Sequence, residues 1–389
     1  MFTLHLKHGK DKPVRMGHPW IFSGAVAREQ GNAGPGDLCT VVSASGEVLG
    51  TGFYNGHSAI RVRMVALRGE RFDEGVLAQR IKDAVGRRAA ILDTRTDSCR
   101  LVNSEGDRLP GLIVDKFAGG VCVQILTAGM ERLRSFVLAA LAECCAPAFV
   151  FERSDADARV REGLSLQEGI VTGELPSDLA ILENGLRFGA DLAGGQKTGF
   201  FFDQRDNRRL CASYAAGRRL CDCFCYSGGF SVYGLSGGAT SSVMVDTSQP
   251  AVAAALENCS RNGFGADRCT GVTANVFEFL RATDKRFDCI ILDPPKFARH
   301  KGEVDAAARG YKDINLLAFK NIEKGGIVFT FSCSNAIDPY LFRQIVFAAA
   351  ADSGRFVQVL HVLCASPDHP FNIAHREGEY LKGLVVRVE

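Results

Sequence analysis

Two apolar segments end in side chains that are suited to covalent chemistry. The run Phe287-Asp-Cys-Ile-Ile-Leu-Asp293 predicts a buried strand that ends in a carboxylate, and two prolines stiffen the turn after it. The run from Gly325 to Cys333 predicts a second strand, which ends in Ser-Cys-Ser. Successive strands of a doubly wound sheet are usually neighbours, so Asp293 and Cys333 are predicted to lie side by side at its carboxyl edge. A thiol beside a carboxylate indicates a nucleophile with a hydrogen-bonding acid or base, and a buried structural cysteine is the alternative.

A third segment has the form of a nucleotide-binding loop. A strand over 220–225 leads into Tyr226-Ser227-Gly228-Gly229, where glycine lets the backbone approach a ligand closely. The segment lacks the G-x-G-x-x-G pattern of dinucleotide-binding proteins. Asp222 lies in this strand, and Asp246 ends the next strand 24 residues later, where a carboxylate can accept both hydroxyl groups of a ribose. This order favours an adenosyl ligand over a structural turn, and we expect Asp246 to face the pocket without holding a buried partner.

Three cysteines near this loop raise the alternative of a metal site. Alternate residues of a strand share one face, so Cys221, Cys223 and Cys225 form a row and do not surround an ion. Zinc sites combine two pairs of ligands from separate segments. We therefore predict small buried core cysteines and no metal.

Two basic stretches are candidates for contact with nucleic acid. Residues 1–28 contain five lysines and arginines and one acid, together with Trp20. Phosphate contact and base stacking would make this stretch a binding surface, and a solvated face with Trp20 in the core is the alternative. Residues 296–320 follow Asp293 closely and carry six basic residues against three acids: Lys296, Arg299, Lys301, Arg309, Lys312 and Lys320. These side chains could hold phosphates beside a flipped base.

The segment 194–209 combines glycines, aromatics and charges at a density that is unusual for a linker. Arg205 is expected to pair with a carboxylate, and the phenylalanines are expected to line an apolar pocket. A capped helix start with surface charge is the alternative.

The remaining chain predicts an α/β protein that can position these segments. From about residue 215, strands alternate with helical stretches, which indicates a Rossmann-like, seven-stranded doubly wound sheet that is mainly parallel. Its strands are expected over Arg219–Phe224, Ser242–Asp246, Cys269–Ala274, Phe287–Asp293, Gly326–Ser332, Arg355–Leu363 and Leu384–Val388. We expect a small β-barrel domain over 1–70, a central α+β domain over 71–178 and the sheet domain over 179–389.

Several shorter elements are expected before the sheet domain, where Asn184-Gly185 predicts a hairpin turn. The barrel strands are expected over Leu38–Val42, Glu47–Gly50 and Ala59–Met64. The central domain is expected to contain helices over Asp73–Leu92 and Glu131–Cys144 and strands over Cys99–Asn103, Gly111–Lys116, Val121–Leu126 and Ala148–Glu152.

The composition is that of an ordinary globular protein. Of the 389 residues, 46% are hydrophobic and 23% are charged, and the net charge of +2 excludes a disordered or histone-like chain. The first residues lack the apolar core of a signal peptide, and no stretch reaches the roughly 20 apolar residues of a membrane span. Because the 14 cysteines come without an export signal, we predict reduced thiols and a cytoplasmic protein.

These motifs together resemble the RNA cytosine-5 methyltransferases of the ribosomal large-subunit methyltransferase I type, over essentially the whole chain. His18-Pro-Trp-Ile-Phe22 is similar to the start of that family's N-terminal PUA domain, an RNA-binding pseudo-barrel. The other matching motifs are Gln196–Phe200, Asp203-Gln-Arg205, Phe224–Phe230, Asp293-Pro-Pro-Lys-Phe297, Ser332–Ser334 and Tyr380-Leu-Lys382. Their combination is far more specific than any one motif.

The resemblance implies a class I methyltransferase that uses S-adenosylmethionine and methylates C5 of a cytosine in 23S rRNA. Cys333 would add to C6 of the base, and Asp293 would hold the base through N3 and N4. The implied cofactor-binding residues are Phe202, Asp203 and Arg205 near the methionine end, Asp222, Tyr226, Ser227 and Gly228 around the loop, Asp246 at the ribose, Asn275 and Val276 at the adenine, and Asp293. The implied substrate-binding residues are Lys296, Phe297, Lys7, Lys10, Arg15 and Trp20.

The chain departs from related enzymes at two places. Asn275 stands where the family more often has aspartate, and its amide oxygen is expected to bind the adenine amino group instead. Pro295 and Lys296 occupy the place of a second cysteine found in another group of RNA cytosine-5 methyltransferases. N-methylation of an rRNA base and a non-catalytic RNA-binding assembly factor stay open. The expected partner is 23S rRNA or a large-subunit precursor, without a membrane, and a homodimer is also open.

Overall fold

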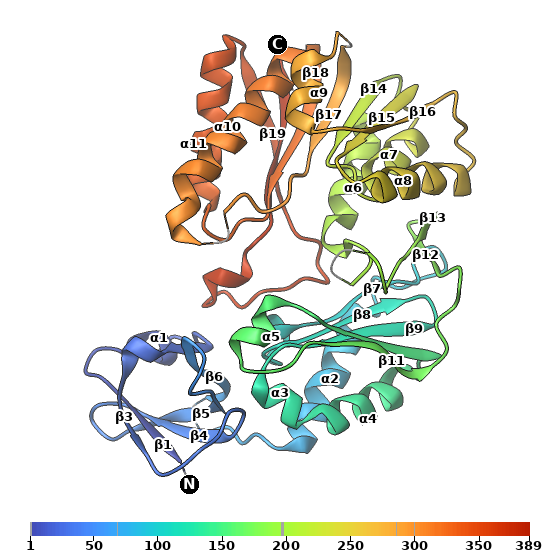
Figure 1. Cartoon of the computed structure of the whole chain (residues 1–389). Coiled ribbons are helices and arrows are strands. Elements are labelled where there is room, and N and C mark those ends of the chain that lie inside the picture. Colours follow the sequence, from blue (N-terminus) through green and yellow to red (C-terminus); the bar gives the residue numbers. More distant parts are fainter. Residues whose placement is uncertain (1, 68, 196–197, 285, 299) are drawn as a thin grey trace. The chain divides into compact units, whose positions relative to one another are not determined.

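The computed structural model describes residues 2–67, 69–195, 198–284, 286–298 and 300–389, and Figure 1 shows its helices and strands. The chain forms two compact units, each assembled from separate parts of the sequence. The first unit contains residues 1–182, 190–202 and 368–378, and the second unit contains residues 183–189, 203–367 and 379–389. The domain boundaries expected after residues 70 and 178 stay predictions.

The first unit begins with a six-stranded sheet in the order β2-β6-β5-β4-β1-β3. Its elements are β1 (Thr3–Leu6), α1 (Lys12–Arg15), β2 (Trp20–Phe22), β3 (Val26–Gln30), β4 (Leu38–Val42), β5 (Val48–Tyr54) and β6 (Ile60–Leu67). Leu4 and Leu6 are both buried, as the period of two along a strand requires. The prediction of a small β domain is confirmed. Strands β1, β2 and β3 were not expected from the sequence, because they are short and β3 exposes most of its side chains.

A second sheet of the first unit has the order β11-β10-β9-β8-β7. Its elements are α2 (Glu74–Arg88), β7 (Cys99–Asn103), β8 (Leu112–Phe117), β9 (Gly120–Ile125), α3 (Ala128–Arg132), α4 (Arg134–Cys145), β10 (Phe149–Ser154), α5 (Asp157–Arg161) and β11 (Gln167–Gly173). Helix α2 begins where the side chain of Asp73 accepts a hydrogen bond from the Val76 amide. The expected strands are confirmed, but the helix expected over Glu131–Cys144 is two helices, with Leu133 between them.

The hairpin predicted at Asn184-Gly185 is confirmed. Strands β12 (Ala180–Glu183) and β13 (Leu186–Gly189) flank this turn and pair with each other. Both turn residues have positive φ, at 52° and 84°. Two-residue hairpin turns of this kind match the twist of the flanking strands, and asparagine and glycine tolerate their backbone conformation best.

The second unit is built on a seven-stranded sheet in the order β16-β15-β14-β17-β18-β20-β19. The strands are β14 (Arg219–Cys223), β15 (Ser241–Asp246), β16 (Cys269–Thr273), β17 (Phe287–Leu292), β18 (Ile322–Ser332), β19 (Val357–Cys364) and β20 (Lys382–Val388). Strands β14 to β18 are parallel, and β20 runs antiparallel between β18 and β19. The predicted mainly parallel, doubly wound sheet is therefore confirmed. The strand order reverses between β14 and β17, and ligands of such sheets bind outside the carboxyl ends of the strands at this switch point.

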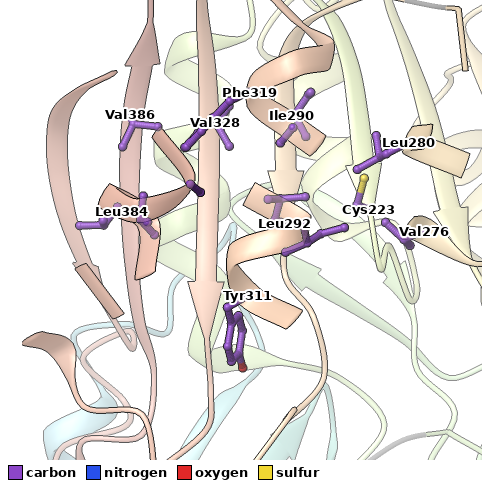
Figure 2. Close-up of a cluster of buried hydrophobic side chains, with 14 of the residues drawn as sticks. Cys223, Val276, Leu280, Ile290, Leu292, Tyr311, Phe319, Val328, Leu384 and Val386 are labelled. Carbon is purple, nitrogen blue, oxygen red and sulfur yellow. The ribbon is translucent and has the colours of Figure 1, made fainter. Parts of the chain in front are cut away.

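Helices cover both faces of this sheet: α6 (Arg205–Tyr214), α7 (Gly229–Ser236), α8 (Gln249–Arg261), α9 (Val276–Ala282), α10 (Val304–Asn321) and α11 (Pro339–Ser353). Helix α7 packs so closely on Leu220 that a Cβ at Gly234 would lie 2.1 Å from it. Helices α9, α10 and α11 pack on the opposite face, where Cys223, Ile290 and Val328 belong to one buried core (Figure 2). Among the described residues, none of the helices has both the length and the apolar character that crossing a membrane requires.

Candidate active site

The loop after β14 is held in a strained conformation at the switch point. Phe224, Tyr226 and Gly228 have positive φ, at 60°, 47° and 73°. Residues other than glycine rarely adopt this region, and such strain is concentrated at functional sites. A Cβ at Gly228 would lie 2.8 Å from the Cβ of Ala255 in α8, so a larger residue would force the loop to move. The predicted loop residues Tyr226, Ser227 and Gly228 thus lie together where ligands of this fold bind.

Asp222 is buried in β14 and anchors the first turn of α7. Its Oδ2 accepts hydrogen bonds from the backbone amide of Ser231 at 3.1 Å and from the Ser231 hydroxyl at 2.7 Å. Burial raises the pKa of Asp222 to about 7, and the nearby carboxylates of Asp293 and Asp246 act in the same direction, against the hydrogen bonds from Ser231. Its contact with a cofactor stays a prediction.

Asp246 ends β15 and supports the neighbouring loop. Its Oδ2 accepts a hydrogen bond from the backbone amide of Tyr226 at 3.1 Å, and its Oδ1 accepts one from the amide of Ser248 at 2.9 Å. Asp246 was expected to hold no buried partner, and both of its partners are only partly buried, but the carboxylate does support the loop. The residue is still partly exposed, and a carboxylate oxygen can accept more than one hydrogen bond, so a ribose could also bind there.

Asn275 and Val276 begin α9 and have structural contacts of their own. Asn275 is the N-cap, and its Oδ1 accepts hydrogen bonds from the amides of Phe277 at 2.9 Å and Glu278 at 3.4 Å. The side chain of Val276 is buried in the core beneath α9. The expected hydrogen bond from adenine to the Asn275 oxygen would thus compete with the helix cap, and Val276 would have to contact adenine through its backbone.

The motif before α6 is divided between the two units. Phe202 belongs to the first unit, where its buried ring lies 5.2 Å from the ring of Phe117 and 5.3 Å from that of Phe200. Gln196 and Lys197 lie outside the described residues. The place of Phe202 beside a methionine chain stays a prediction.

Asp203 and Arg205 belong to the second unit and are both buried. Asp203 Oδ2 accepts a hydrogen bond of 2.6 Å from the hydroxyl of Tyr380, which lies just before β20. Arg205 Nε lies 3.6 Å from Glu183 Oε2, so the prediction that this arginine pairs with a carboxylate is confirmed. The two residues join segments that are far apart in the sequence, and their cofactor contacts stay predictions.

Asp293 follows β17 directly and is oriented by a buried amide. Its Oδ2 accepts a hydrogen bond of 3.0 Å from Gln204 Nε2. The Gln204 Oε1 in turn accepts one of 2.6 Å from Asn207 Nδ2, which determines which end of the Gln204 amide faces the carboxylate. This chain of hydrogen bonds holds the Asp293 carboxylate in place, and its contact with a substrate stays a prediction.

Cys333 follows β18, the strand that pairs in parallel with β17. Its Sγ lies 3.9 Å from the carbonyl oxygen of Pro294, the residue after Asp293. The prediction that the Asp293 turn and Cys333 lie side by side is therefore confirmed. Cys333 is partly exposed.

Lys296 and Phe297 extend this site along the turn after β17. Lys296 is exposed. The centroids of the Phe297 and Tyr311 rings lie 4.6 Å apart. In the basic stretch that follows, Lys312 pairs with Asp352 at 2.6 Å. Arg299 lies outside the described residues. The substrate contacts of Lys296 and Phe297 stay predictions.

The residues predicted to bind RNA near the N-terminus all belong to the first unit. Lys7 and Lys10 are exposed, whereas Trp20 donates a hydrogen bond of 2.7 Å from Nε1 to Glu105 Oε1. Arg15 pairs with two carboxylates, and it lowers the pKa of both: Asp11 and Glu47. Because Trp20 and Arg15 are engaged in these contacts, Lys7 and Lys10 are the more accessible candidates for binding RNA.

The cysteine row along β14 is part of the hydrophobic core. Cys221 and Cys223 are completely buried, with their sulfurs 3.6 Å apart, and Cys225 is also buried. This confirms the prediction of small core cysteines. The described residues contain no group of three or more histidine, cysteine or acidic side chains placed to hold a metal ion.

Three residues of this site were not assigned a role from the sequence, although each lies in a motif noted there. Gln204 orients Asp293, Tyr380 binds Asp203, and Lys382 donates hydrogen bonds to the turn after Cys333. The sequence signal that could have identified them as site residues is their presence in the Asp203-Gln-Arg205 and Tyr380-Leu-Lys382 motifs.

The sequence matches two known families. Residues 4–66 match a PUA-like domain, and residues 156–375 match an S-adenosylmethionine-dependent methyltransferase family. The second match covers more than half of the chain. The chain belongs to the S-adenosylmethionine-dependent methyltransferase family. Its cofactor is S-adenosylmethionine.

This methyltransferase is similar to named proteins along its whole length. It is 41% identical over 392 residues to the ribosomal RNA large subunit methyltransferase I of Aeromonas hydrophila, which covers 99% of both chains. It is 41% identical over 388 residues to the protein of the same name from Alteromonas mediterranea, with 98% of both chains covered. Two solved methyltransferases share the fold over 100% of both chains: one from Streptococcus mutans (TM-score 0.86, 20% identity) and one in complex with SAH (TM-score 0.87, 21% identity).

The residues at the switch point fit S-adenosylmethionine. Asp246 places a partly exposed carboxylate at a strand end, where it suits the two hydroxyl groups of a ribose. The strained loop from Phe224 to Gly228 brings backbone to the same edge of the sheet. These features lie at the carboxyl edge of the sheet, and their contacts with the cofactor stay predictions.

Proposed function

We propose that this methyltransferase methylates C5 of a cytosine in the RNA of the large ribosomal subunit. The names of its full-length relatives support ribosomal RNA of that subunit as the substrate. The observation that favours C5 over a base nitrogen as the methylated atom is the position of Cys333 beside the Asp293–Pro294 turn. A base nitrogen needs no nucleophilic thiol for methylation, whereas C5 of cytosine does, because it is a poor nucleophile. The partner is 23S rRNA or a precursor of the large subunit.

The side chains of the site suit the steps that C5 methylation requires. The Cys333 thiolate adds to C6 of the base, which forms the C6–S bond and turns the ring into an enamine with a nucleophilic C5. Bound S-adenosylmethionine supplies an electrophilic methyl group. As negative charge develops on the ring, N3 takes up a proton from solvent, and Asp293 accepts hydrogen bonds from N3–H and from the N4 amino group while Gln204 keeps its carboxylate in place. The C5 proton then leaves, the C6–S bond breaks, and the aromatic ring is restored.

The proposal assigns the remaining residues to the cofactor and the RNA. Around the cofactor we place Phe202, Asp203, Arg205, Asp222, Tyr226, Ser227, Gly228, Asp246, Asn275, Val276 and Asp293. Lys296 and Phe297 would contact the flipped base and its neighbouring phosphates. The PUA-like domain within residues 1–70 would bind RNA elsewhere, chiefly through Lys7 and Lys10, with Arg15 and Trp20 supporting the surface.

RNA that contains 5-fluorocytidine tests the covalent step. Fluorine at C5 cannot leave as a cation, so elimination stalls after methyl transfer and the C6–S bond persists. The wild-type protein should form a denaturant-resistant adduct, which mass spectrometry would locate on the peptide with Cys333. Cys333→Ala should bind RNA and cofactor yet form neither adduct nor product.

Cys364→Ala provides a matched control, because Cys364 is an exposed cysteine of the same unit. This variant should form the adduct like the wild type. Near wild-type turnover of Cys333→Ala would refute the covalent mechanism. Nucleosides from RNA modified by the wild type would then show the methyl group on nitrogen if N-methylation is correct. Failure of the wild type to bind the cofactor at all would favour the non-catalytic assembly factor.

A further inference from the structure

The antiparallel strand β20 brings a lysine to the edge of the sheet where Cys333 lies. Because β20 runs opposite to β18, its first residue lies at the edge where the parallel strands end. Lys382 begins β20 and pairs with Ser332, the residue before Cys333. Ser334 and Lys382 are 48 positions apart in the sequence, so no local pattern predicts that they are neighbours.

Lys382 is buried, and its side chain is held by the turn that follows Cys333. It is 5% exposed, and Nζ donates hydrogen bonds to the carbonyl oxygens of Ser334 at 2.7 Å and Ile337 at 2.6 Å. An ammonium group has three N–H donors. In the part of the chain that the structure describes, these two carbonyls are its hydrogen-bond acceptors, which leaves one donor available.

A buried ammonium group is costly unless a negative charge lies close to it. Among the described residues, no carboxylate oxygen lies within the 4.0 Å of an ion pair with Lys382. Burial lowers the pKa of Lys382 to about 8, and the group that opposes this most is Cys333 in its thiolate form. Glu379 before β20 and Asp338 at the start of α11 also raise this pKa, while Lys296 lowers it. The thiolate form of Cys333 also contributes to raising the pKa of Tyr311 in α10.

We propose that Lys382 is a positioning residue for Cys333: its ammonium group fixes the turn after the cysteine and favours the thiolate over the thiol. The interaction of two titrating groups is mutual, so a thiolate that favours the ammonium is favoured by it to the same extent. The thiol proton passes to solvent, and Lys382 remains charged. This inference rests on the proposed function, in which Cys333 attacks as a thiolate, whereas a free cysteine has a pKa of about 8.5.

The pH dependence of Cys333 alkylation tests this inference on the full chain without RNA. Iodoacetamide reacts with thiolates, and mass spectrometry of the Cys333 peptide separates this cysteine from the others. The midpoint is the pH at which the alkylation rate is half of its maximum. In the wild type this midpoint should lie at least about one pH unit below 8.5. Lys382→Met should raise the midpoint by about one unit or more, and Lys382→Arg, which keeps the charge, should raise it less.

Lys324→Met is the matched control, because Lys324 is an exposed lysine at the opposite end of β18. Its midpoint should equal that of the wild type. Binding of S-adenosylhomocysteine, measured by calorimetry, would show that each variant is folded. A wild-type midpoint at or above about 8.5 would overturn the inference without any variant, and so would an unchanged midpoint in folded Lys382→Met. Failure of the cytosine-5 proposal would instead appear as turnover by Cys333→Ala, so the two failures are distinguishable.

Discussion

Replacing Asp246 by alanine should weaken both the fold and cofactor binding. The change removes the acceptors of the Tyr226 and Ser248 amides, which lie 3.1 Å and 2.9 Å from the carboxylate. Each such hydrogen bond to a charged acceptor contributes about 1.5–3 kcal/mol, so the free energy of unfolding should fall by at most roughly 3–6 kcal/mol. Because Asp246 is partly exposed, water will replace part of this loss. Asp246→Asn keeps one carboxylate-like oxygen and should lose about half as much.

The effect on the cofactor can be separated from the effect on the fold. Hydrogen bonds to a charged group contribute about 1.5–3 kcal/mol, so the loss of one or two at the ribose should weaken binding by about 10-fold to 100-fold after water competes. Urea unfolding followed by circular dichroism without ligand would measure the first effect, and calorimetry with S-adenosylhomocysteine would measure the second. Asp267→Ala, an exposed carboxylate before β16 at the opposite edge of the sheet, should change neither quantity.

Two results would refute this reasoning in different ways. An unfolding free energy of Asp246→Ala equal to that of the wild type would show that the amides of Tyr226 and Ser248 do not depend on the carboxylate. Wild-type affinity for S-adenosylhomocysteine would show that Asp246 does not bind the ribose.

Other predictions concern the Asp293 carboxylate, the pH dependence of stability and the binding of RNA. Gln204→Leu removes the donor that holds Asp293, so turnover should fall about tenfold or more with unchanged cofactor affinity, as single-turnover assays and calorimetry would show. The folded-state pKa of Asp222 is raised from 3.8 to about 7, so the folded protein binds more protons than the unfolded chain between these values. Its contribution to stability should be complete below about pH 4 and should be lost as the pH rises through about 7, and Asp222→Asn should remove this dependence in urea titrations. The double variant Lys7→Glu and Lys10→Glu should bind RNA more weakly and with a smaller salt dependence, without loss of cofactor affinity in filter-binding and calorimetric assays.

The strands of the seven-stranded sheet were predictable because they are short apolar runs bounded by turns. Cys289 and Ile290 of β17 and Val328 and Phe329 of β18 are buried, so their runs are continuous in apolar residues. The helix expected over Glu131–Cys144 was less predictable, because nothing in its apolar spacing marks the interruption at Leu133. Weakly amphipathic strands such as β3 and β11, which expose many side chains, gave little signal.

Contacts of single side chains were the least predictable part of the site. Asp246 and Asn275 were expected to serve a ligand, but both accept hydrogen bonds from backbone amides nearby. Trp20 was a candidate for base stacking, but its indole binds Glu105, which lies 85 residues away. A polar or aromatic side chain suits several partners equally well, and the partner depends on which backbone lies within hydrogen-bond distance.

The sequence by itself determined the alternation of strands and helices from about residue 215, the loop after β14, and the positions of Asp293 and Cys333 at two strand ends. These features depend on apolar periodicity and on prolines and glycines within a few residues, which are local properties of the chain. Only the tertiary structure decided which side chains surround Asp293 and Cys333. Gln204 reaches Asp293 across 89 residues, and Lys382 reaches the turn after Cys333 because β20 runs antiparallel to β18. The direction of a strand in a sheet follows from how the chain packs, and it brings distant segments to one edge in a way that no local pattern records.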